Sequence, residues 1–474
     1  MSRAKSSPVS SAPPFLKRSA SARAWTFGVL NEVLATSQFA HQVWEQWSPQ
    51  CPLDDRDRRL VWELIHGVGR RRRTLETILA AVVTRPLDRI EPELKTLALL
   101  GIYQLVFLSS IPAHAAVHET VELARAYGQP RWCGFLNGIL RGVQRMLTDD
   151  ESAAPAANAV PIGDAAYRVL TKPVFPEPQR DPNGYLAAAF GLPVWLVERW
   201  KSVADFAELV RWGFWFNAPA LLTLRVNRLR SNREQVLQEF ESAGVAAEPG
   251  EYDEIIRLRE SASVVELPGF GDGWWTVQDE TAFQACRLLA PQPGESVLDL
   301  CAAPGTKSTC LAEMMHDEGT ILATDVADVR LNSVTQNARR LGLKIIETKV
   351  ISDVTKSHRR FIDQFAGRRF DAVLVDAPCS NTGVIGKRLE VRDRLEPKDI
   401  TELAEIQFQL LSAAIELVRT GGRVVYSTCS IEPEENRQVV DRALREHTNV
   451  TLASDQLFFP GRPADGGYSA LING

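Results

Sequence analysis

Apolar residues recur every three or four positions through the first third of the chain. This spacing places them on one face of an α-helix. The pattern is clearest over residues 23–39, 56–66, 93–108 and 118–127, and no strand-like alternation of useful length interrupts it. We therefore expect residues 21–147 to form an all-α domain, preceded by a flexible tail at residues 1–20.

The pattern changes twice before the middle of the chain. Residues 148–185 begin with three acidic side chains and continue with many Ala and Pro residues, which is typical of a linker. A helix-like segment follows at residues 193–212, then a strand at 221–226, a helix at 232–244 and a strand at 255–258. Residues 186–275 are thus predicted to form a small α+β module.

Unbroken apolar runs separated by amphipathic segments mark the last 200 residues. The apolar runs lie at residues 296–300, 321–324, 372–375 and 423–427, a strand-like stretch lies at 344–351, and helix-like segments lie at 329–341 and 402–418. Strands buried on both faces of a parallel sheet have this character. Residues 276–474 are therefore predicted to form a Rossmann-like, doubly wound α/β domain.

Composition excludes several classes of protein. The 474 residues are 45% hydrophobic and 24% charged, as in ordinary globular domains. The longest strongly apolar stretch, residues 97–108, is too short to span a bilayer, and the first 25 residues lack the apolar core of a secretory signal. Seven widely spaced cysteines fit reduced thiols in the cytoplasm better than a disulfide framework. The sequence has no metal-binding pattern such as CxxC or HExxH, so no metal is expected.

Charge is distributed unevenly along the chain. Residues 1–147 hold 19 Lys and Arg against 12 Asp and Glu, a balance of +7, which leaves −12 for the rest of a chain whose total is −5. A basic first part suggests a polyanionic partner. The densest cluster is Arg70 to Arg73, which is interpreted either as a solvated helix end or as a contact with phosphates.

The residues after the first predicted strand suit a nucleoside-containing ligand. In open parallel sheets, ligands bind at the carboxyl ends of the strands, where the strand order reverses. Small residues and a glycine there let a ligand approach the backbone. The segment is neither GxGxxG nor a Walker A loop, which argues against a nicotinamide cofactor or a nucleoside triphosphate. Its residues are Cys301, Ala302, Ala303, Pro304, Gly305, Thr306 and Lys307.

Two acidic residues follow the next strands. Asp325 comes 20 residues after Gly305, the usual spacing of a ribose-hydroxyl acceptor, although it could instead cap the next helix. Asp353 follows the third strand-like run. It could accept a hydrogen bond from an adenine amino group, or it could simply cap a turn.

Two thiols lie just past the last two predicted strands. Cys379 follows Asp376 after three residues, and Cys429 follows the run that ends at Ser427. A thiolate can add to C6 of cytosine, which makes C5 nucleophilic enough to take a methyl group from a sulfonium donor such as S-adenosylmethionine. A nearby carboxyl group stabilises charge that moves into the ring. The strand ends therefore favour covalent methyl transfer to a pyrimidine.

These motifs resemble the RsmB/Sun (NOL1/NOP2/Sun) family of RNA cytosine-C5 methyltransferases. The matching stretches are residues 297–305, 376–380, 428–430 and 433–436. The helical part resembles the RNA-binding fold of the antitermination factor NusB, through residues 111–117, 119–121 and 135–141. A fusion of these two parts is characteristic of the RsmB branch, which implies small-subunit (16S) ribosomal RNA as the substrate.

The resemblance implies a role for each site residue. Cys429 would attack C6, Cys379 would assist release of the product, and Asp376 would contact both the cytosine edge and the methyl donor. Residues 301–307, together with Asp325, Asp353 and Asp376, would hold S-adenosylmethionine. DNA cytosine methyltransferases instead use the cysteine of a Pro-Cys pair, here Cys379, but the likeness to the RNA family is closer.

The sequence departs from the family at two places. Thr306 stands where the family has a second glycine, which suggests a slightly different backbone path near the cofactor. Residues 387–391 replace a His-Pro-Asp-like stretch, which bears on contacts with the substrate.

Other functions remain open at this point. The same chemistry on transfer RNA and a non-catalytic RNA-binding assembly factor are the alternatives. A thiol hydrolase is disfavoured because no histidine falls at a strand end near either cysteine. We expect a cytoplasmic monomer that binds ribosomal RNA, with no membrane partner.

Overall fold

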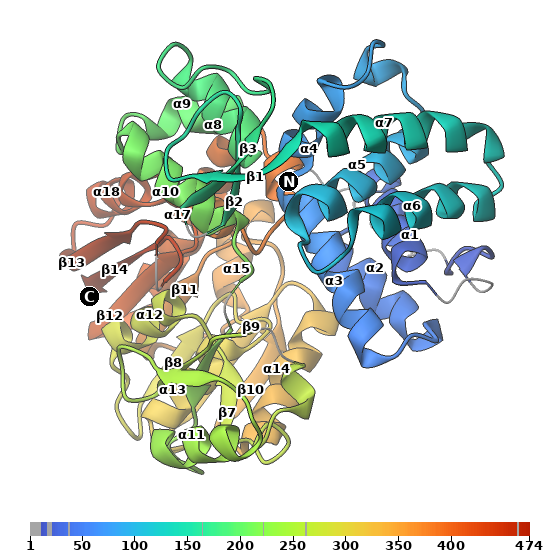
Figure 1. The fold of residues 1–474 in the computed structure, drawn as a ribbon. Coiled ribbons are helices and arrows are strands. Elements are labelled where there is room, and N and C mark those ends of the chain that lie inside the picture. The colour runs from blue at the N-terminus through green and yellow to red at the C-terminus, as the bar shows by residue number, and fades with distance from the viewer. Residues whose placement is uncertain are drawn as a thin grey trace. The chain divides into compact units, whose positions relative to one another are not determined.

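The computed structural model describes residues 11–16, 21–36, 38–163, 165–220, 222–260, 263–461 and 464–474. The chain divides into two units (Figure 1). The first unit comprises Met1–Ala218 together with Arg388–Arg394, and the second comprises Pro219–Lys387 and Leu395–Gly474. The predicted tail falls mostly outside the described residues. Its described part, residues 11–16, is packed rather than free, since Leu16 is fully buried and the Phe15 ring lies 5.2 Å from that of Tyr127.

Helices make up the beginning of the first unit, as the periodicity predicts. Its central helix is apolar all round because other helices surround it, and every residue from Thr96 to Val106 is buried. The helices are α1 (Ala22–Ala35), α2 (Ala40–Trp47), α3 (Asp55–Arg70), α4 (Arg72–Ala80), the central α5 (Pro92–Phe107), α6 (Ala113–Ala126) and α7 (Cys133–Met146).

The interpretation of residues 148–185 as a linker is wrong. This part of the chain contains a three-stranded antiparallel sheet of order β1-β3-β2, with strands β1 (Leu147–Ser152), β2 (Ala159–Gly163) and β3 (Ala166–Leu170). Val160 and Tyr167 are buried in it, so the segment contributes to the core of the unit. The high content of proline and alanine suggested a linker. Composition alone does not show which residues pair as strands. Helices α8 (Pro182–Phe190), α9 (Val194–Trp200) and α10 (Phe206–Asn217) complete this part.

The arginine cluster is structural. Arg70 and Arg71 are buried, and the Arg71 guanidinium donates to the Pro161 carbonyl at 2.7 Å while it lies 4.2 Å from the centre of the Phe107 ring. Arg72 and Arg73 form ion pairs with Asp393, at 3.2 and 3.6 Å. Arg70 and Arg71 are therefore neither a solvated helix end nor a phosphate contact, because both side chains are buried and the Arg71 guanidinium donates to backbone carbonyls.

Residues 388–394 belong to the first unit, although the residues before and after them in the sequence belong to the second. The segment ends in the short helix α16 (Val391–Arg394), and Arg392 is buried. Its guanidinium donates to the carbonyls of Arg70 (2.5 Å), Phe190 (2.9 Å) and Phe216 (2.7 Å). Four of the five residues at 387–391, the stretch expected to differ from the family, thus lie in the first unit, where the segment forms internal contacts.

The second unit begins with a four-stranded antiparallel sheet of order β5-β6-β4-β7. Its core contains Leu224, Phe240 and Trp275. The predicted strands and the predicted helix at 232–244 are found here, although Leu221 lies outside the described residues. The predicted helix at 193–212 is instead two helices, α9 and α10, of the first unit. The elements are β4 (Thr223–Val226), α11 (Arg233–Ser242), β5 (Ala247–Pro249), β6 (Ile255–Leu258) and β7 (Trp275–Val277).

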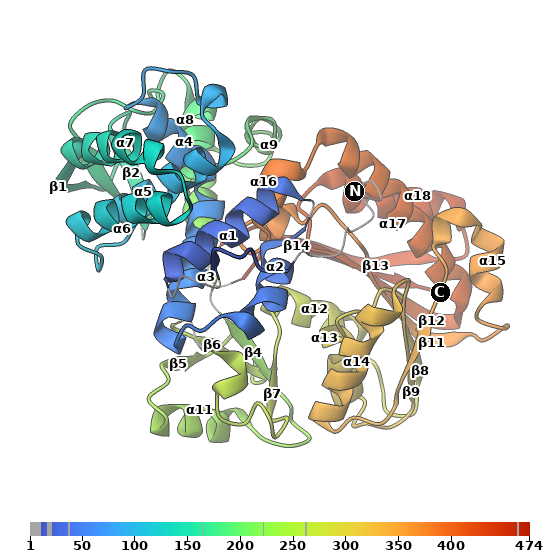
Figure 2. The same cartoon turned by 90° about the vertical axis from the view of Figure 1, so that its right-hand side faces the viewer.

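A seven-stranded sheet of order β10-β9-β8-β11-β12-β14-β13 forms the rest of the second unit (Figure 2). The first five strands are parallel, as predicted, and β14 pairs antiparallel with both β12 and β13. The two antiparallel strands were not predicted. The strands are β8 (Ser296–Asp299), β9 (Thr320–Asp325), β10 (Ile346–Val350), β11 (Phe370–Asp376), β12 (Val418–Thr428), β13 (Thr451–Phe458) and β14 (Gly467–Asn473).

Successive residues of the central strands point to opposite faces of this sheet, so each strand contributes to two cores. Val297 and Leu374 pack with α12 (Glu280–Leu289), α13 (Thr306–Met314) and α14 (Asp328–Leu341) on one face. Leu298 and Val373 pack on the other with α15 (His358–Asp363), α17 (Pro397–Leu417) and α18 (Arg437–Glu446). Burial on both faces explains the unbroken apolar runs. Within the described ranges, every helix is too short or too polar to cross a membrane.

We predict that Arg392→Met destabilises the first unit by about 3–5 kcal/mol, because it leaves three buried carbonyls without their donor. Urea unfolding of the full chain measures the change. The control is Arg388→Met, at an exposed position of the same segment. Equal unfolding midpoints for the two variants would show that the buried guanidinium contributes nothing.

Candidate active site

The strand order reverses between β8 and β11, and the predicted site residues follow the strands at that point. Asp376 at the end of β11 pairs in register with Ser427 of β12, so the two parallel strands finish at the same level. The loops that follow bring Cys379 and Cys429 together, with their sulfur atoms 3.0 Å apart. Two thiols 50 residues apart in sequence therefore share one site.

The loop after β8 turns at Gly305 and continues into α13. Gly305 has φ +99°, and a Cβ atom there would come within 2.9 Å of the Val334 Cα, so only glycine fits. Thr306 is the first residue of α13 and needs no such freedom, which accounts for the missing second glycine. The buried Arg225 of β4 donates to the Thr306 carbonyl at 3.0 Å and pairs with Glu313 at 2.8 Å, which fixes this helix beside the loop.

Asp325 ends β9, and Asp353 lies three residues past the end of the neighbouring strand β10. Asp325 is buried, accepts from the Ala327 backbone N–H at 3.1 Å and pairs with Arg330 at 3.0 Å. The residue that caps α14 is Ala327, so Asp325 is not itself the cap. Asp353 accepts a hydrogen bond from the Thr355 N–H at 3.0 Å and caps a short turn. This is the second of the two roles considered for it from the sequence. A contact with adenine stays a prediction.

Asp376 forms an ion pair with Lys307, with the Nζ and Oδ2 atoms 2.7 Å apart. Burial opposes the charge of Lys307, but the adjacent Asp376 carboxylate outweighs burial and raises the pKa of the ammonium group. The pair joins the loop after β8 to the end of β11. It places one negative and one positive group at the strand ends from which the two cysteine loops depart.

A buried carboxylate that the sequence interpretation did not single out ties the cysteine loops together. Glu435 accepts from the Ser380 backbone N–H at 2.8 Å, from the Ser430 hydroxyl at 2.5 Å, from Gln407 at 3.0 Å and from the Ser380 hydroxyl. Ser380 and Ser430 each follow one of the two cysteines. Burial raises the pKa of Glu435, and these hydrogen bonds oppose the rise.

Asp299, at the end of β8, is the second group that lacked an assigned role. It is fully buried, and its Oδ2 accepts from the Ser308 hydroxyl at 2.6 Å while its Oδ1 has no hydrogen-bond partner among the described residues. Burial raises the pKa of Asp299 to about 7, although the hydrogen bond from Ser308 opposes the rise. In the sequence, Asp299 and Glu435 lie within two of the stretches that resemble the family, residues 297–305 and 433–436, and this was the only signal that could have identified them.

Comparisons with known families cover most of the chain. Residues 286–464 match a family model described as 16S rRNA methyltransferase RsmB/F, residues 20–145 match the NusB family, and residues 192–265 match the ferredoxin-like domain of RsmF/B-like methyltransferases. The ribosomal RNA small subunit methyltransferase B of Serratia proteamaculans is 36% identical over 90% of this chain and 92% of that protein. This chain belongs to the ribosomal RNA small subunit methyltransferase B family.

Other members and solved structures agree with this family. A probable ribosomal RNA small subunit methyltransferase B of Bacillus subtilis is 32% identical over 83% of this chain and 81% of that protein. The crystal structure of PH0851 has a TM-score of 0.73 at 25% identity and covers 98% of this chain and all of that one. A methyltransferase homolog from Pyrococcus horikoshii has a TM-score of 0.53 at 26% identity, over 61% of this chain and 97% of that one. The predicted family and fold class are thereby confirmed.

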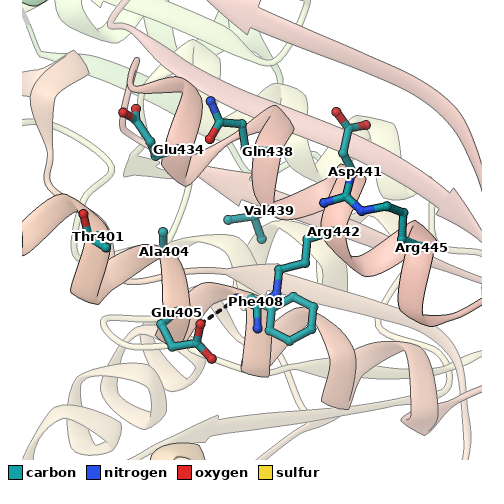
Figure 3. Close-up of a pocket in the computed structure, with 10 residues that line it drawn as sticks. All are labelled: Thr401, Ala404, Glu405, Phe408, Glu434, Gln438, Val439, Asp441, Arg442 and Arg445. Atoms are coloured by element: carbon teal, nitrogen blue, oxygen red, sulfur yellow. Dashed lines mark hydrogen bonds and ion pairs between the residues drawn. The ribbon is translucent and has the colours of Figure 1, made fainter.

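A pocket of about 390 Å³ lies apart from the site in this family member (Figure 3). Residues of α17, α18 and the turn before α18 line it, and the Arg442 guanidinium lies 3.6 Å from the centre of the Phe408 ring and pairs with Glu405 at 2.5 Å. None of the predicted site residues lines this pocket. The chemistry of the strand ends, rather than this pocket, therefore identifies the candidate site. The described part of the chain has no cluster of His, Cys, Asp and Glu suited to hold a metal ion.

We predict that Asp299 makes the stability of the ligand-free protein depend on pH. The folded protein keeps the Asp299 proton up to about pH 7, whereas the unfolded chain releases it near 3.8. The folded state therefore binds more protons between these values, and its free energy of unfolding falls as the pH rises, by up to about 1.4 kcal/mol per pH unit. Asp299→Asn, a neutral mimic, should reduce this slope between pH 5 and 7 in urea titrations. Identical slopes would contradict the buried, protonated carboxyl.

Proposed function

We propose that this chain uses S-adenosylmethionine to methylate C5 of a cytidine in small-subunit (16S) ribosomal RNA, through a covalent bond between Cys429 and C6. The observation that carries the proposal is the pair of thiols 3.0 Å apart beside the Asp376–Lys307 ion pair. Nucleophilic catalysis on a pyrimidine needs a sulfur that reaches C6 and charged groups that stabilise the activated ring. The names of the relatives support ribosomal RNA as the substrate.

The residues at the strand ends fit S-adenosylmethionine. The unpartnered Oδ1 of Asp299 is a buried acceptor suited to the ammonium group at the methionine end. Asp325 would accept from the ribose hydroxyls, and the exposed Val326 and Val350 would contact the adenine ring, with Asp353 near its amino group. Residues Cys301 to Lys307 would form the loop against which the donor lies, and Gly305 would let the donor come close to the backbone. When bound, the donor supplies an electrophilic methyl group.

The chain's own groups carry out the covalent steps. Cys429 gives up its proton to solvent, and its sulfur forms a bond with C6, which moves electron density to C5. Asp376 would contact the edge of the cytosine ring and hold it while charge develops there, with Lys307 keeping the carboxylate in place. After methyl transfer, solvent water takes the C5 proton, the C5–C6 double bond forms again, and the C6–S bond breaks, so that the Cys429 sulfur leaves as a thiolate.

Cys379 suits the release step rather than the attack. Its hydrogen bond with Cys429 raises its pKa well above the ordinary value, and burial and the nearby charges of Cys429 and Glu435 act in the same direction. A thiol held in its protonated form is a poor nucleophile. The DNA-enzyme arrangement, in which the Pro-Cys thiol attacks, is therefore disfavoured for this chain.

The first unit would bind the RNA. It matches the NusB family and carries exposed arginines on its helices, among them Arg59, Arg141 and Arg145. Contacts between such side chains and phosphates would give an affinity that falls steeply with salt. A cytidine must leave its base stack before C5 and C6 can be reached, so a single-stranded or flipped nucleotide is the proposed substrate.

Cys429→Ala should abolish methyl transfer because no other group replaces the attacking sulfur. Incorporation of tritium from labelled S-adenosylmethionine into small-subunit ribosomal RNA measures this, and bulk transfer RNA tests the alternative substrate. Cys133→Ala, in the first unit, is the matched control and should keep full activity. Labelling by the Cys429 variant at near the unsubstituted rate would remove Cys429 from its role.

Cys379→Ala should instead accumulate the covalent protein–RNA adduct, since attack proceeds while release slows. Denaturing gel electrophoresis after incubation with RNA and S-adenosylmethionine shows such an adduct as a slowly migrating band. The double variant with Cys429→Ala should lack the band. If the single variant gives none either, Cys379 has no part in release.

A further inference from the structure

Asn381 lies between the two cysteines, although it belongs to none of the roles described above. It lies two residues after Cys379 and has φ +61°, a left-handed conformation that asparagine adopts more readily than most residues. Its backbone begins the short turn Thr382–Val384, where the Gly383 N–H donates to the Cys429 carbonyl at 3.0 Å. The side chain is thereby directed at both sulfur-bearing loops.

The two ends of the Asn381 carboxamide have different partners. Its Nδ2 donates to the Cys379 carbonyl at 2.8 Å, which fixes the orientation of the amide. Its Oδ1 lies 3.1 Å from the Cys429 sulfur. An amide oxygen only accepts hydrogen bonds, so the Cys429 S–H must be the donor of this contact.

This orientation decides the direction of the contact between the thiols. Each thiol carries one proton, and that of Cys429 is directed at Asn381. Across the 3.0 Å contact, Cys379 is therefore the donor and the Cys429 sulfur is the acceptor. The three residues form a closed ring: Cys379 thiol to Cys429 sulfur, Cys429 thiol to Asn381, and Asn381 amide to the Cys379 backbone.

We propose that Asn381 is a positioning residue that sets the direction of hydrogen bonding between the two thiols and so makes Cys429 the attacking sulfur. This inference rests on the proposed function and deepens it. In the resting protein the Asn381 Oδ1 accepts the Cys429 S–H, which leaves the Cys429 sulfur to accept from the Cys379 S–H. Once the Cys429 proton has passed to solvent, the Cys379 S–H still supports the thiolate while the amide oxygen no longer holds it.

Alkylation of the free protein tests the contact without RNA. Iodoacetamide at pH 8 modifies thiolates, and peptide mapping reports the rate at each cysteine separately. Removal of the amide in Asn381→Gly, which keeps the left-handed backbone, should speed Cys429 alkylation by about fivefold. Asn381→Asp places a fixed negative charge beside the sulfur and should slow it by about fivefold. Cys133, half-buried in the first unit, is the internal reference and should react alike in all three proteins.

The opposite changes expected for Gly and Asp separate positioning from a structural role. A substitution that merely loosened the loop would speed alkylation in both variants. Equal rates in all three proteins, or faster reaction in Asn381→Asp than in the unsubstituted protein, would overturn the proposal.

Methyl transfer gives the second measurement. Asn381→Gly should lower kcat by about tenfold while KM for RNA stays within about twofold. The Cys429 sulfur remains accessible in this variant, but no hydrogen bond to residue 381 fixes its orientation. Asn232→Gly, at the N-terminal cap of α11, is the matched control and should keep the unsubstituted rate. An unchanged kcat in Asn381→Gly would overturn the positioning role.

The two measurements distinguish failure of this inference from failure of the proposed function. If the unsubstituted protein transfers no methyl group to RNA, the proposed function fails, while the alkylation series still judges the contact between Asn381 and Cys429. If methyl transfer is normal and the alkylation rates do not differ, only the role of Asn381 fails.

Discussion

The parallel register between β11 and β12 is the constraint on which the candidate site depends. Asp376 lies opposite Ser427, so both strands finish at the same level and the loops beyond them run side by side. Each loop then reaches its cysteine within three residues, and the two sulfurs lie 3.0 Å apart. A slip of one residue in this register would turn every side chain of the strand to the other face and would exchange the two cores of the sheet.

Buried polar groups hold the parts of this molecule in one arrangement. Glu435 is costly to bury, yet its hydrogen bonds come from both cysteine loops and from Gln407 of α17, so all are satisfied only when these elements meet correctly. Arg392 acts in the same way in the first unit, where its guanidinium serves carbonyls of α3, α8 and α10. Such networks contribute specificity of arrangement as much as stability.

The chemistry proposed for the site depends on unequal surroundings for two identical side chains. Cys379 is buried, and its neighbours favour the protonated form, whereas Cys429 is half-buried and its sulfur lies 3.1 Å from the Asn381 Oδ1. A symmetrical pair would offer two competing nucleophiles. The asymmetry comes from unequal burial and from neighbouring groups, among them Glu435 and the Asn381 amide.

Much of this protein could be predicted from its sequence because the informative signals are local. Helical periodicity indicated the all-α character of residues 21–147, and four apolar runs and one strand-like stretch indicated the five parallel strands. Residues that directly follow strands, such as Asp376, Cys379 and Cys429, could be assigned to one edge of the sheet. Composition failed for residues 148–185, where buried pairing forms a sheet, and it gave no indication that Arg70 and Arg71 are buried.

Only the tertiary structure decided which groups meet across long separations in sequence. Glu435 contacts Ser380 and Asn381 contacts Cys429, and no local pattern marks either pair. The antiparallel strands β13 and β14 were missed for the same reason, since β13 exposes most of its side chains and lacks a regular apolar period. Local sequence fixes the period of an element, whereas hydrogen bonds between distant residues form only after the chain has folded, and these bonds give the two thiols their different surroundings.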